Sequence, residues 1–450
     1  MSSHTLEQLA RDIVRMAMER GATGAEATIS EGDEFSAAVR MREVESLKDA
    51  GSRGAGVRVL RGKRSGSSYT SDLSAEGIER MVRSALDLVS ITSEDPHAGL
   101  PDASELGSID GDLRLYSEAV ARLETEYKIA QARQAEEAAL AYDPRINNSE
   151  GASFDSHQGA RIFANSLGFS GSYRTSSCSL SVVPVARDHD RMERDYWFSA
   201  AREYERLEQP EEIGRKAAER ALRRLGARKV ATQRVPVIFE PRVAKSLLDH
   251  VFEAVHGESV YRKASFLAGR LGEGVASANV TIVDDSTLPG LFGTCPFDDE
   301  GVPSRRTVVI ERGVLKSYLL NTYTARKLGL KTTGSASRGI TGNAGIGHGN
   351  FYLEAGGRDA PSILSGVKAG LYVTELMGFG VNGVTGDYSR GAAGMWIENG
   401  ELAYPVSEVT IAGNLQQMLR DIEAVGSDLE FRGSTASPTV LIHEMTVSGH

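Results

Sequence analysis

The first part of the chain combines one helical pattern with a series of alternating apolar and polar residues. Apolar residues recur at helical spacing between residues 6 and 17, which predicts an amphipathic surface helix and not a signal peptide with its uninterrupted apolar core. Strict alternation then predicts half-buried antiparallel strands. These strands are expected at residues 25–32, 35–46, 54–62 and 64–72. Ser74 is expected to cap a second helix over residues 77–88.

A long loop separates this part from a central block. Residues 92–112 are rich in Pro, Gly, Ser and Asp, which is typical of a connection between domains. The central block begins with a predicted helix over 116–142 and closes with another over 211–225. Strand-like segments lie between these helices, and the mixture predicts an α+β layer. We therefore expect an N-terminal α/β domain over residues 1–112 and a central α+β region over 113–230.

In the last half of the chain glycine becomes frequent and strand-like segments dominate. One strand and one helix come first, and Asn399-Gly400 later predicts a hairpin turn. Further helices are expected only at 321–328 and 412–425. Residues 231–450 therefore form a predicted β-rich C-terminal domain. The fold class is α+β, with a mostly antiparallel N-terminal sheet and flanking helices followed by this β-rich domain.

Composition and charge narrow the function classes. The 450 residues suffice for two or three domains, and the 40% hydrophobic content is ordinary for a globular protein. A formal net charge of −10 argues against direct nucleic-acid binding, which requires clustered Lys and Arg. The distant Cys178 and Cys295 exclude a disulfide framework and predict a cytoplasmic location. No run approaches the ~20 apolar residues that a bilayer span needs, so we expect no membrane contact.

One predicted helix carries candidate metal ligands. In SLLDHVFEAVHGESVYRK, residues 246–263, His250, Glu253 and His256 stand in an apolar frame. The two histidines lie roughly 120° apart around a helix, far from the ~40° of an HExxH pair that shares one ion. Glu253 and His256 could share a metal, but zinc requires three protein ligands. The spacing favours a polar interface and leaves Glu253 and His256 as the catalytic candidates.

The segment CPFDDEGVPSRR places three adjacent carboxylates, Asp298, Asp299 and Glu300, ahead of a predicted hairpin. Such a group can bind a cation or raise the pKa of one acid. Adjacent residues of an extended chain point to opposite faces, however, so all three should not converge. A solvated loop, or pairing with Arg305 or Arg306, is the alternative interpretation.

A glycine-rich segment, GDYSRGAAG at residues 386–394, combines Asp387 and Arg390 with small residues that let backbones approach closely. This composition suits the floor of a groove. Together with the three carboxylates above, Asp387 and Arg390 are candidate residues of a peptide groove. The preceding GFGVNG is not followed by a predicted helix, so it does not indicate a dinucleotide site.

Long blocks of the sequence resemble the TldD/PmbA family, once labelled modulators of DNA gyrase. The clearest block is VTELMGFGVNGVTGDYSRGAAGMWIENGELAYPVSEVTIAGNL at residues 373–415. Further blocks are MERDYW, GESVYRKASFL, CPFDDEGVPSRR, YTARKLGLKTTG, GNFYLEAG and GVRVLRGKRSGSSYTSDLS. The resemblance spans nearly the whole chain. It implies a family of zinc metallopeptidases that act on unfolded peptides, take part in peptide maturation and work as pairs of related subunits.

Within that family, the resemblance also suggests a subunit type. The catalytic TldD type carries an HExxxH helix and a late cysteine, which the PmbA (TldE) type lacks. Carried onto this sequence, the six positions run from Phe252 to Gly257, and only Glu253 matches. Phe252 and Gly257 replace the histidines, His256 stands one place early, and no cysteine follows Cys295. The resemblance therefore implies a PmbA (TldE)-type subunit that binds no metal or other cofactor itself.

The same resemblance implies partners. We expect a heterodimer with a TldD-like subunit that holds the zinc, a homodimer of the isolated chain, and an unfolded peptide as substrate. Two alternatives stay open. One is an autonomous peptidase that uses Glu253 and His256 with a carboxylate from residues 298–300. The other is a non-enzymatic protein that binds DNA gyrase or its inhibitors.

Overall fold

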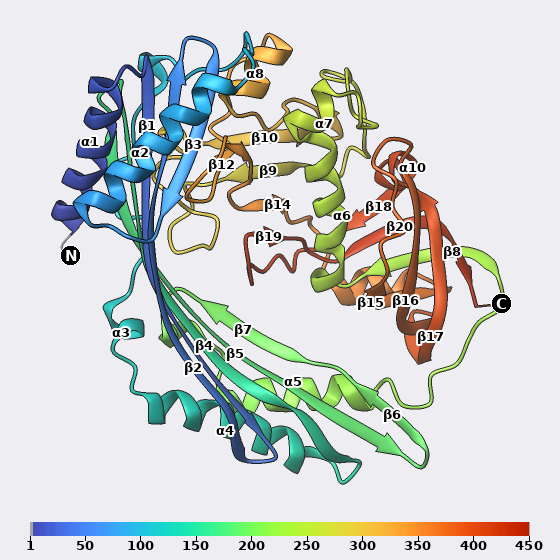
Figure 1. Ribbon diagram of the computed structural model, residues 1–450. Coiled ribbons are helices and arrows are strands. Elements are labelled where there is room, and N and C mark those ends of the chain that lie inside the picture. The colour runs from blue at the N-terminus through green and yellow to red at the C-terminus, as the bar shows by residue number, and fades with distance from the viewer. Residues whose placement is uncertain (1–2, 450) are drawn as a thin grey trace.

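The strands of the N-terminal and central segments form one sheet. The computed structural model describes residues 3–449, and within them the strand order is β3-β2-β1-β4-β5-β6, with β7 paired to β5 (Figure 1). The strands are β1 (Gly24–Arg40), β2 (Glu43–Arg61), β3 (Arg64–Thr70), β4 (Ile146–Asn165), β5 (Ser170–Asp188), β6 (Arg191–Arg194) and β7 (Trp197–Ala201). These neighbours all run antiparallel, as the alternation predicts. The loop at residues 92–112 therefore connects two parts of one sheet.

Helices cover one face of this sheet in two groups. The helices and short 3-10 turns are α1 (Ser3–Glu19), α2 (Ala75–Ile91), η1 (Ala103–Glu105), α3 (Glu118–Ala121), α4 (Thr125–Tyr142), η2 (Tyr204–Arg206) and α5 (Pro210–Leu222). Apolar residues of α1 and α2 share a core with one end of β1, and those of α4 and α5 share another core with its opposite end. Ser74 caps α2 as predicted, because its hydroxyl accepts a hydrogen bond from the Gly77 N–H. The single helix predicted over 116–142 is wrong, since the chain leaves the helix at Arg122 between α3 and α4.

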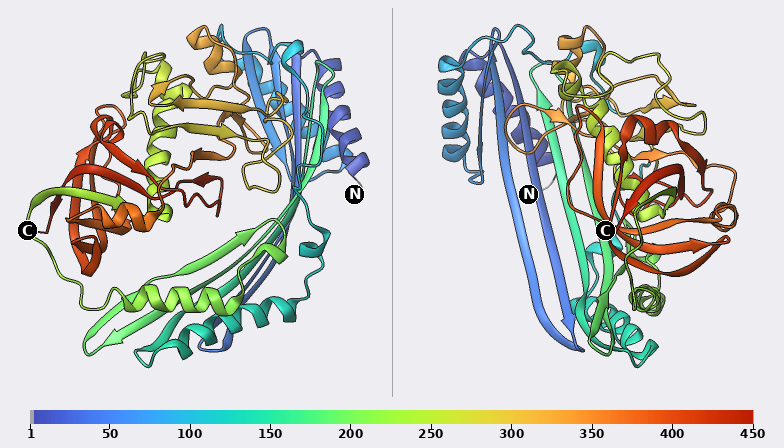
Figure 2. Two further views of the ribbon diagram at one scale, coloured as in Figure 1. Left: turned by 180° about the vertical axis from the view of Figure 1, so that it is seen from behind. Right: turned by 90° about the vertical axis from the view of Figure 1, so that its right-hand side faces the viewer.

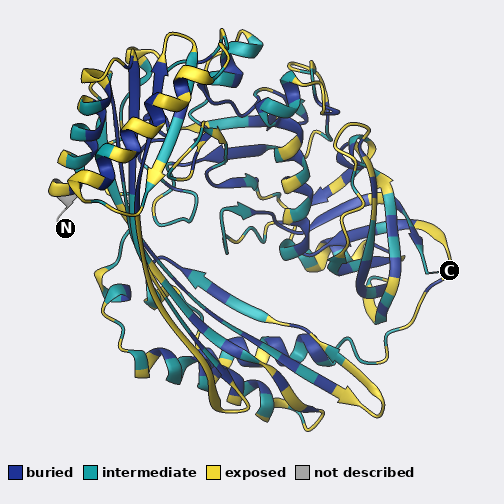
Figure 3. Ribbon diagram, viewed as in Figure 1, coloured by how far each residue is buried: buried dark blue, intermediate teal, exposed yellow. Residues whose placement is uncertain are grey.

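Burial divides the sheet into two halves. The doubly covered half consists of residues 24–29 of β1, 54–60 of β2 and 162–165 of β4, and all of them are buried (Figure 3). The open half consists of residues 30–40 of β1, 43–53 of β2 and 146–161 of β4. In the open half burial alternates along β4, and residues 43–53 of β2 are exposed throughout. Both helix groups pack on the same face, so the halves differ in what lies on the other face.

The C-terminal domain covers that other face of the doubly covered half (Figures 1 and 2). Gly56 makes this approach possible, because a Cβ there would lie 1.3 Å from the Ile340 carbonyl oxygen. Glu26 accepts hydrogen bonds from Arg58 at 2.8 Å and from Arg338 at 2.9 Å within the interface. Burial raises the pKa of Glu26, but the two guanidiniums outweigh it and hold the pKa below its ordinary value. This buried ion network joins the sheet to the C-terminal domain.

The C-terminal domain is built on two further sheets and a β-ribbon. Within residues 3–449 their orders are β11-β10-β9-β14-β19, β17-β16-β15-β8-β20-β18 and β12-β13. Their strands are β8 (Gln233–Phe239), β9 (Ile282–Asp285), β10 (Arg306–Glu311), β11 (Val314–Leu315), β12 (Ala336–Ser337), β13 (Gly345–Ile346), β14 (Phe351–Leu353), β15 (Ala369–Met377), β16 (Asp387–Glu398), β17 (Glu401–Asn414), β18 (Ile422–Val425), β19 (Thr435–Ala436) and β20 (Val440–Ser448). The turn at Asn399-Gly400 joins β16 to β17 with φ of 52° and 83°, which confirms the predicted hairpin.

Helix α6 lies between the two larger sheets and contributes to the core that they share (Figure 1). The helices of this domain are α6 (Pro241–Val255), α7 (Gly257–Tyr261), α8 (Thr322–Leu328), α9 (Ala360–Ser365) and α10 (Leu415–Arg420). Helix α8 confirms the prediction at 321–328. The helix predicted over 412–425 is too long, because β18 begins at Ile422, and α9 was not predicted. The α+β class with a β-rich C-terminal domain is confirmed. Among residues 3–449, no helix is long and apolar enough to cross a bilayer.

Candidate functional site

The segment with the candidate metal ligands is not one helix, so this part of the prediction is wrong. Helix α6 ends at Val255, and His256 takes the extended conformation, with φ −62° and ψ 121°. The backbone pairs there with Leu319, which accepts a hydrogen bond from the Gly257 N–H at 3.0 Å and donates one to the Val255 carbonyl. Gly257 is required at this point, because a Cβ would lie 2.7 Å from side-chain atoms of Leu320 and Thr324. The bridge to Leu319 therefore breaks the helix.

The break separates the two catalytic candidates. Glu253 lines a cavity of about 580 Å³ together with His250, whereas His256 lines a different cavity of about 360 Å³. The His256 ring packs edge-on against Phe252, with centroids 5.6 Å apart. Its Nδ1 atom is buried and has no hydrogen-bond partner. Because Glu253 and His256 line different cavities, this conformation does not bring them together at one ion.

The HExxxH positions do not fit a zinc ion. Phe252 occupies the first histidine position, and its ring packs against His348 at 4.8 Å and Phe351 at 6.0 Å between centroids. Gly257 occupies the last position and is buried against α8. Within residues 3–449, no group of three or more His, Cys, Asp or Glu side chains is arranged to hold a metal ion. Only Glu253 remains from the motif, and it is exposed.

The cavity beside Glu253 brings together residues from α6 and from the glycine-rich segment. His250 and Arg390 both line it, and the His250 ring packs edge-on against the Tyr388 ring, with centroids 6.0 Å apart. Burial lowers the pKa of His250, and the Arg390 charge lowers it further, so the imidazole is neutral at pH 7. Burial also raises the pKa of Tyr388 to about 12, against the effect of Arg390. Tyr388 was missed in the sequence, although it stands in the same GDYSRG segment as Arg390.

The second cavity lies between the N-terminal sheet and the C-terminal domain. His256 and Glu300 line it, together with Arg58 from β2 and Tyr323 from α8. Glu300 is 4% exposed and accepts a hydrogen bond from the Thr322 N–H at 2.8 Å. Burial raises the pKa of Glu300 against the effect of that bond. Of the three adjacent carboxylates, Glu300 is the one that lines a cavity beside a catalytic candidate.

The other two carboxylates have structural contacts, and the interpretation of the triplet as a solvated loop is wrong. Asp298 is 5% exposed and accepts three backbone N–H groups, one of them from Ala336 at 3.0 Å. Burial and the neighbouring Glu300 raise the pKa of Asp298 well above its ordinary value against these bonds. Asp299 pairs with Arg161 at 2.6 Å, and neither predicted arginine takes that place. The three carboxylates do not meet at one point, but Asp299 and Glu300 lie in a turn and not in the extended segment that was expected.

Asp387, the remaining candidate of the peptide groove, lies at the start of β16. It is exposed, and one of its oxygens accepts a hydrogen bond from Thr385 at 2.7 Å. Asn414, on the neighbouring strand β17, donates a weaker bond to its other oxygen at 3.4 Å. These contacts fix the turn before β16. Arg390, three residues on, reaches the cavity beside Glu253.

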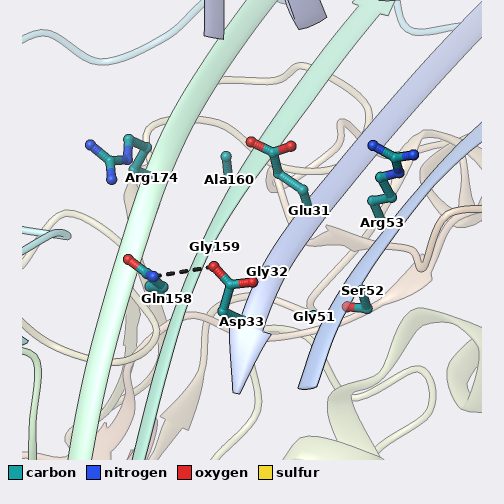
Figure 4. A pocket seen from close by; sticks show the side chains of 10 residues that line it. All are labelled: Glu31, Gly32, Asp33, Gly51, Ser52, Arg53, Gln158, Gly159, Ala160 and Arg174. Carbon is teal, nitrogen blue, oxygen red and sulfur yellow. Dashed lines mark hydrogen bonds between the residues drawn. The ribbon is translucent and has the colours of Figure 1, made fainter. Parts of the chain in front are cut away.

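A further polar cavity lies where the two halves of the long sheet meet, away from the predicted site residues. It measures about 450 Å³, and Figure 4 shows Glu31, Asp33, Arg53 and Arg174 around it. Glu31 lies opposite Arg53 in the strand register, and Asp33 accepts a hydrogen bond from Gln158 at 3.1 Å. This cavity presents charges of both signs, and no residue of α6 lines it. The candidate site therefore remains at α6.

Three family models match most of the chain, one after another along the sequence. Domain 1 of the PmbA/TldA metallopeptidases matches residues 25–89, the central domain matches 118–225 and the C-terminal domain matches 232–449. The class defined by the fold and by the position of α6 is thus that of a metallopeptidase family.

Curated relatives and solved structures agree with these models. The chain is 42% identical to the metalloprotease PmbA of Escherichia coli O157:H7 over 95% of this chain and 92% of that protein. It is 38% identical to a PmbA homologue of Haemophilus influenzae over 99% and 96%. The chain belongs to the PmbA/TldD metallopeptidase family.

Two solved structures show the same architecture. A candidate modulator of DNA gyrase from Bacteroides thetaiotaomicron superposes with a TM-score of 0.93 at 28% identity, over 100% of both chains. TldE from Thermococcus kodakarensis superposes with a TM-score of 0.88 over 98% of this chain and 100% of that one. This chain and the Thermococcus protein are 22% identical, so their similarity shows a shared fold and no more.

Proposed function

We propose that this chain is the PmbA (TldE)-type, non-catalytic subunit of a cytoplasmic TldD/TldE-type metallopeptidase that processes unfolded peptides. In this proposal a TldD-like partner holds the zinc, and this chain binds no metal or other cofactor of its own. The observation that carries it is the placement of the HExxxH positions. Phe252 packs among aromatic rings where a ligand would stand, and His256 lies in a different cavity from Glu253.

The open half of the sheet supports a role in binding extended chains. Strand β3 pairs with β2 only from Ala55 onward, so residues 43–53 of β2 have β1 as their partner on one side and are exposed. A free strand edge binds a peptide through main-chain hydrogen bonds, with little selectivity for side chains. This is the recognition that a processing enzyme for unfolded peptides needs. The subunit would thus contribute to substrate binding while its partner supplies the chemistry.

Co-expression with a TldD-like partner tests this proposal. An unfolded, internally quenched peptide should be cleaved when both chains are present, and a chelator should abolish the cleavage. The variant Glu253→Gln of this chain should retain the activity of the complex, because Glu253 does no chemistry in it. The matched control is the same Glu→Gln change in the HExxxH helix of the partner, which should abolish cleavage.

The same experiment addresses the autonomous peptidase. If the isolated chain binds zinc in a 1:1 ratio and loses its own peptidase activity with Glu253→Gln, the proposal fails and the autonomous enzyme is correct. A third function, binding to DNA gyrase or its inhibitors, is favoured by the name of the Bacteroides relative. Recovery of gyrase on the purified chain, without any TldD-like protein, would support that function instead.

A further inference from the structure

Two cavities meet along one side of α6. The cavity of about 580 Å³ beside Glu253 and a neighbouring cavity of about 480 Å³ are both lined by Ser246 and Arg390. The neighbouring cavity extends from α6 to residues of the central region, among them Arg194. Because they share two lining residues, the two cavities lie side by side, and we call them together the α6 groove. Arg390 stands where its two parts meet.

The arginines of the α6 groove differ in how their charges are compensated. Three of them have a carboxylate within ion-pair distance. The pairs are Arg194–Glu150, Arg224–Glu375 and Arg242–Asp195. Arg390 has no ion pair with any carboxylate of residues 3–449, and its Nε atom is buried without a hydrogen-bond partner. A guanidinium that lines a cavity and has no carboxylate partner of its own keeps its hydrogen-bond donors available to an anion.

One neighbour of Arg390 in the cavity also lacks a partner. The Nε2 atom of His250 is buried without a hydrogen bond, whereas the buried Tyr388 hydroxyl has the Arg390 guanidinium as its polar neighbour. Tyr388 is 2% exposed, and its ring contacts that of His250. Native proteins rarely leave buried polar atoms unpaired. Water can satisfy the imidazole, but it does not neutralise the guanidinium, so Arg390 and His250 together fit an anionic group.

We propose that the α6 groove binds the free C-terminal carboxylate of a peptide, with Arg390 as its counter-ion. A guanidinium binds a carboxylate through two parallel hydrogen bonds. The proposal rests on the proposed function, because a subunit that receives unfolded peptides must accommodate their ends or the ends of their products. The carboxylate site would be the part of this subunit that recognises the end of the peptide.

The rest of the groove suits a peptide end better than an inorganic anion. Asp249 and Glu253 line it near His250, and their negative charges oppose a doubly charged phosphate more than the single charge of a carboxylate. Phe379 is fully exposed at the rim and presents an aromatic ring to an apolar side chain of the ligand. The groove also has room on both sides of Arg390 for residues that precede the carboxylate.

The test is a binding measurement on the full, isolated chain. A pentapeptide with fluorescein on its N-terminus and an apolar last residue is prepared as the free acid and as the C-terminal amide. Fluorescence anisotropy should show that the acid binds about tenfold or more tightly than the amide, as expected for a charge-assisted hydrogen bond. Acetate should compete with the acid peptide, and inorganic phosphate should not bind more tightly than that peptide.

Variants assign the effect to Arg390. Arg390→Gln should abolish the difference between acid and amide, whereas Arg390→Lys keeps the charge and should retain part of it. Arg194→Gln is the matched control, because it changes an arginine of the same groove that is already paired with Glu150. It should leave the ratio of the two affinities unchanged. Circular dichroism on each variant separates loss of binding from loss of fold.

Several results would overturn the inference. They are equal affinity of acid and amide, no binding of either, tighter binding of phosphate than of the acid peptide, or an unchanged ratio in a folded Arg390→Gln variant. None of these measurements uses a partner or proteolysis. Failure of partner-dependent cleavage would therefore refute the proposed function but not the carboxylate site. Equal binding of acid and amide would refute the carboxylate site but not the proposed function.

Discussion

The two halves of the long sheet share the same strands but differ in what covers them. In the doubly covered half, helices lie on one face and the C-terminal domain on the other, and the stretches of β1, β2 and β4 that belong to this half are buried throughout. In the open half, Cys178, Leu180 and Val182 of β5 are buried under α4 and α5, while the alternating Ser177, Ser179 and Ser181 remain half-exposed. The same strands thus serve as an interface at one end and as an accessible surface at the other.

Burial of the strands determines where a charged side chain can be placed without a partner. A carboxylate in the doubly covered half needs partners, and Glu26 has two arginines. A carboxylate in the open half, such as Glu34, stands in water and pairs with Lys48 at 3.2 Å without being buried. Burying a charge without a partner is costly, whereas an exposed pair contributes little.

The largest effect on stability is expected from truncating a buried side chain on the helix-covered face of the open half. Phe154→Ala removes a ring that is 1% exposed beneath α4, which should lower the free energy of unfolding by about 4 kcal/mol. Ser153→Ala, one residue earlier on the opposite face, should change it by less than about 0.5 kcal/mol. Urea denaturation measures both. Similar losses for the two variants would show that the second face is covered as well.

Glu26→Gln should lower the free energy of unfolding by about 3 kcal/mol, because it leaves the Arg58 and Arg338 guanidiniums buried without a counter-charge. The control is Glu34→Gln on the same strand, where an exposed pair is lost and a change below about 0.5 kcal/mol is expected. Chemical denaturation of both variants in parallel measures the contrast. Equal effects would contradict the distinction between the halves.

The pH dependence should be set in part by Asp284, a buried carboxyl group of the C-terminal sheet. Burial raises its pKa to about 7, against a hydrogen bond from the Gly349 N–H. Since the pKa is higher in the folded than in the unfolded protein, the folded state binds the proton more tightly, and stability falls as pH rises from about 4 to about 7. Asp284→Asn should remove about 2 kcal/mol of this fall between pH 5 and 7.5. Thermal unfolding across that range measures it, with the exposed Asp387→Asn as control; a wild-type profile in Asp284→Asn would refute the assignment.

The smallest effect is expected at the free edge of the open half. Leu47 on β2 is 54% exposed, so Leu47→Lys should change the free energy of unfolding of the isolated chain by less than about 0.5 kcal/mol. Denaturation and sedimentation velocity of the two proteins provide the check. A larger loss of stability, or a change in mass, would show that another copy of the chain covers this edge.

Local signals in the sequence were sufficient for much of the fold. Alternation identified β1 to β3, Ser74 marked the start of α2, and Asn399-Gly400 marked a hairpin, since each depends on neighbouring residues alone. The helix break at His256 could not be predicted, because it results from pairing with Leu319, more than sixty positions away. The burial of Asp298 and Glu300 likewise depends on distant segments, whereas a string of charges in sequence indicates solvent.

The candidate site was also predicted only in part from the sequence. The sequence indicated that the HExxxH motif is incomplete, and it singled out Arg390 within a glycine-rich segment. It could not indicate that Arg390 lacks a counter-ion, because this depends on every carboxylate that the fold brings near. It also paired Glu253 with His256, which an uninterrupted helix would have allowed.

The family, most of the element types and the donor atoms available at the motif could be obtained from the sequence, because they follow from residue identity and local periodicity. Which of those groups meet depends on the tertiary structure. It joined two segments into one sheet, placed Glu253 and His256 in different cavities, and left one arginine uncompensated in a groove. Burial and charge pairing are sums over neighbours that are distant along the chain, and the local pattern of residues does not contain them.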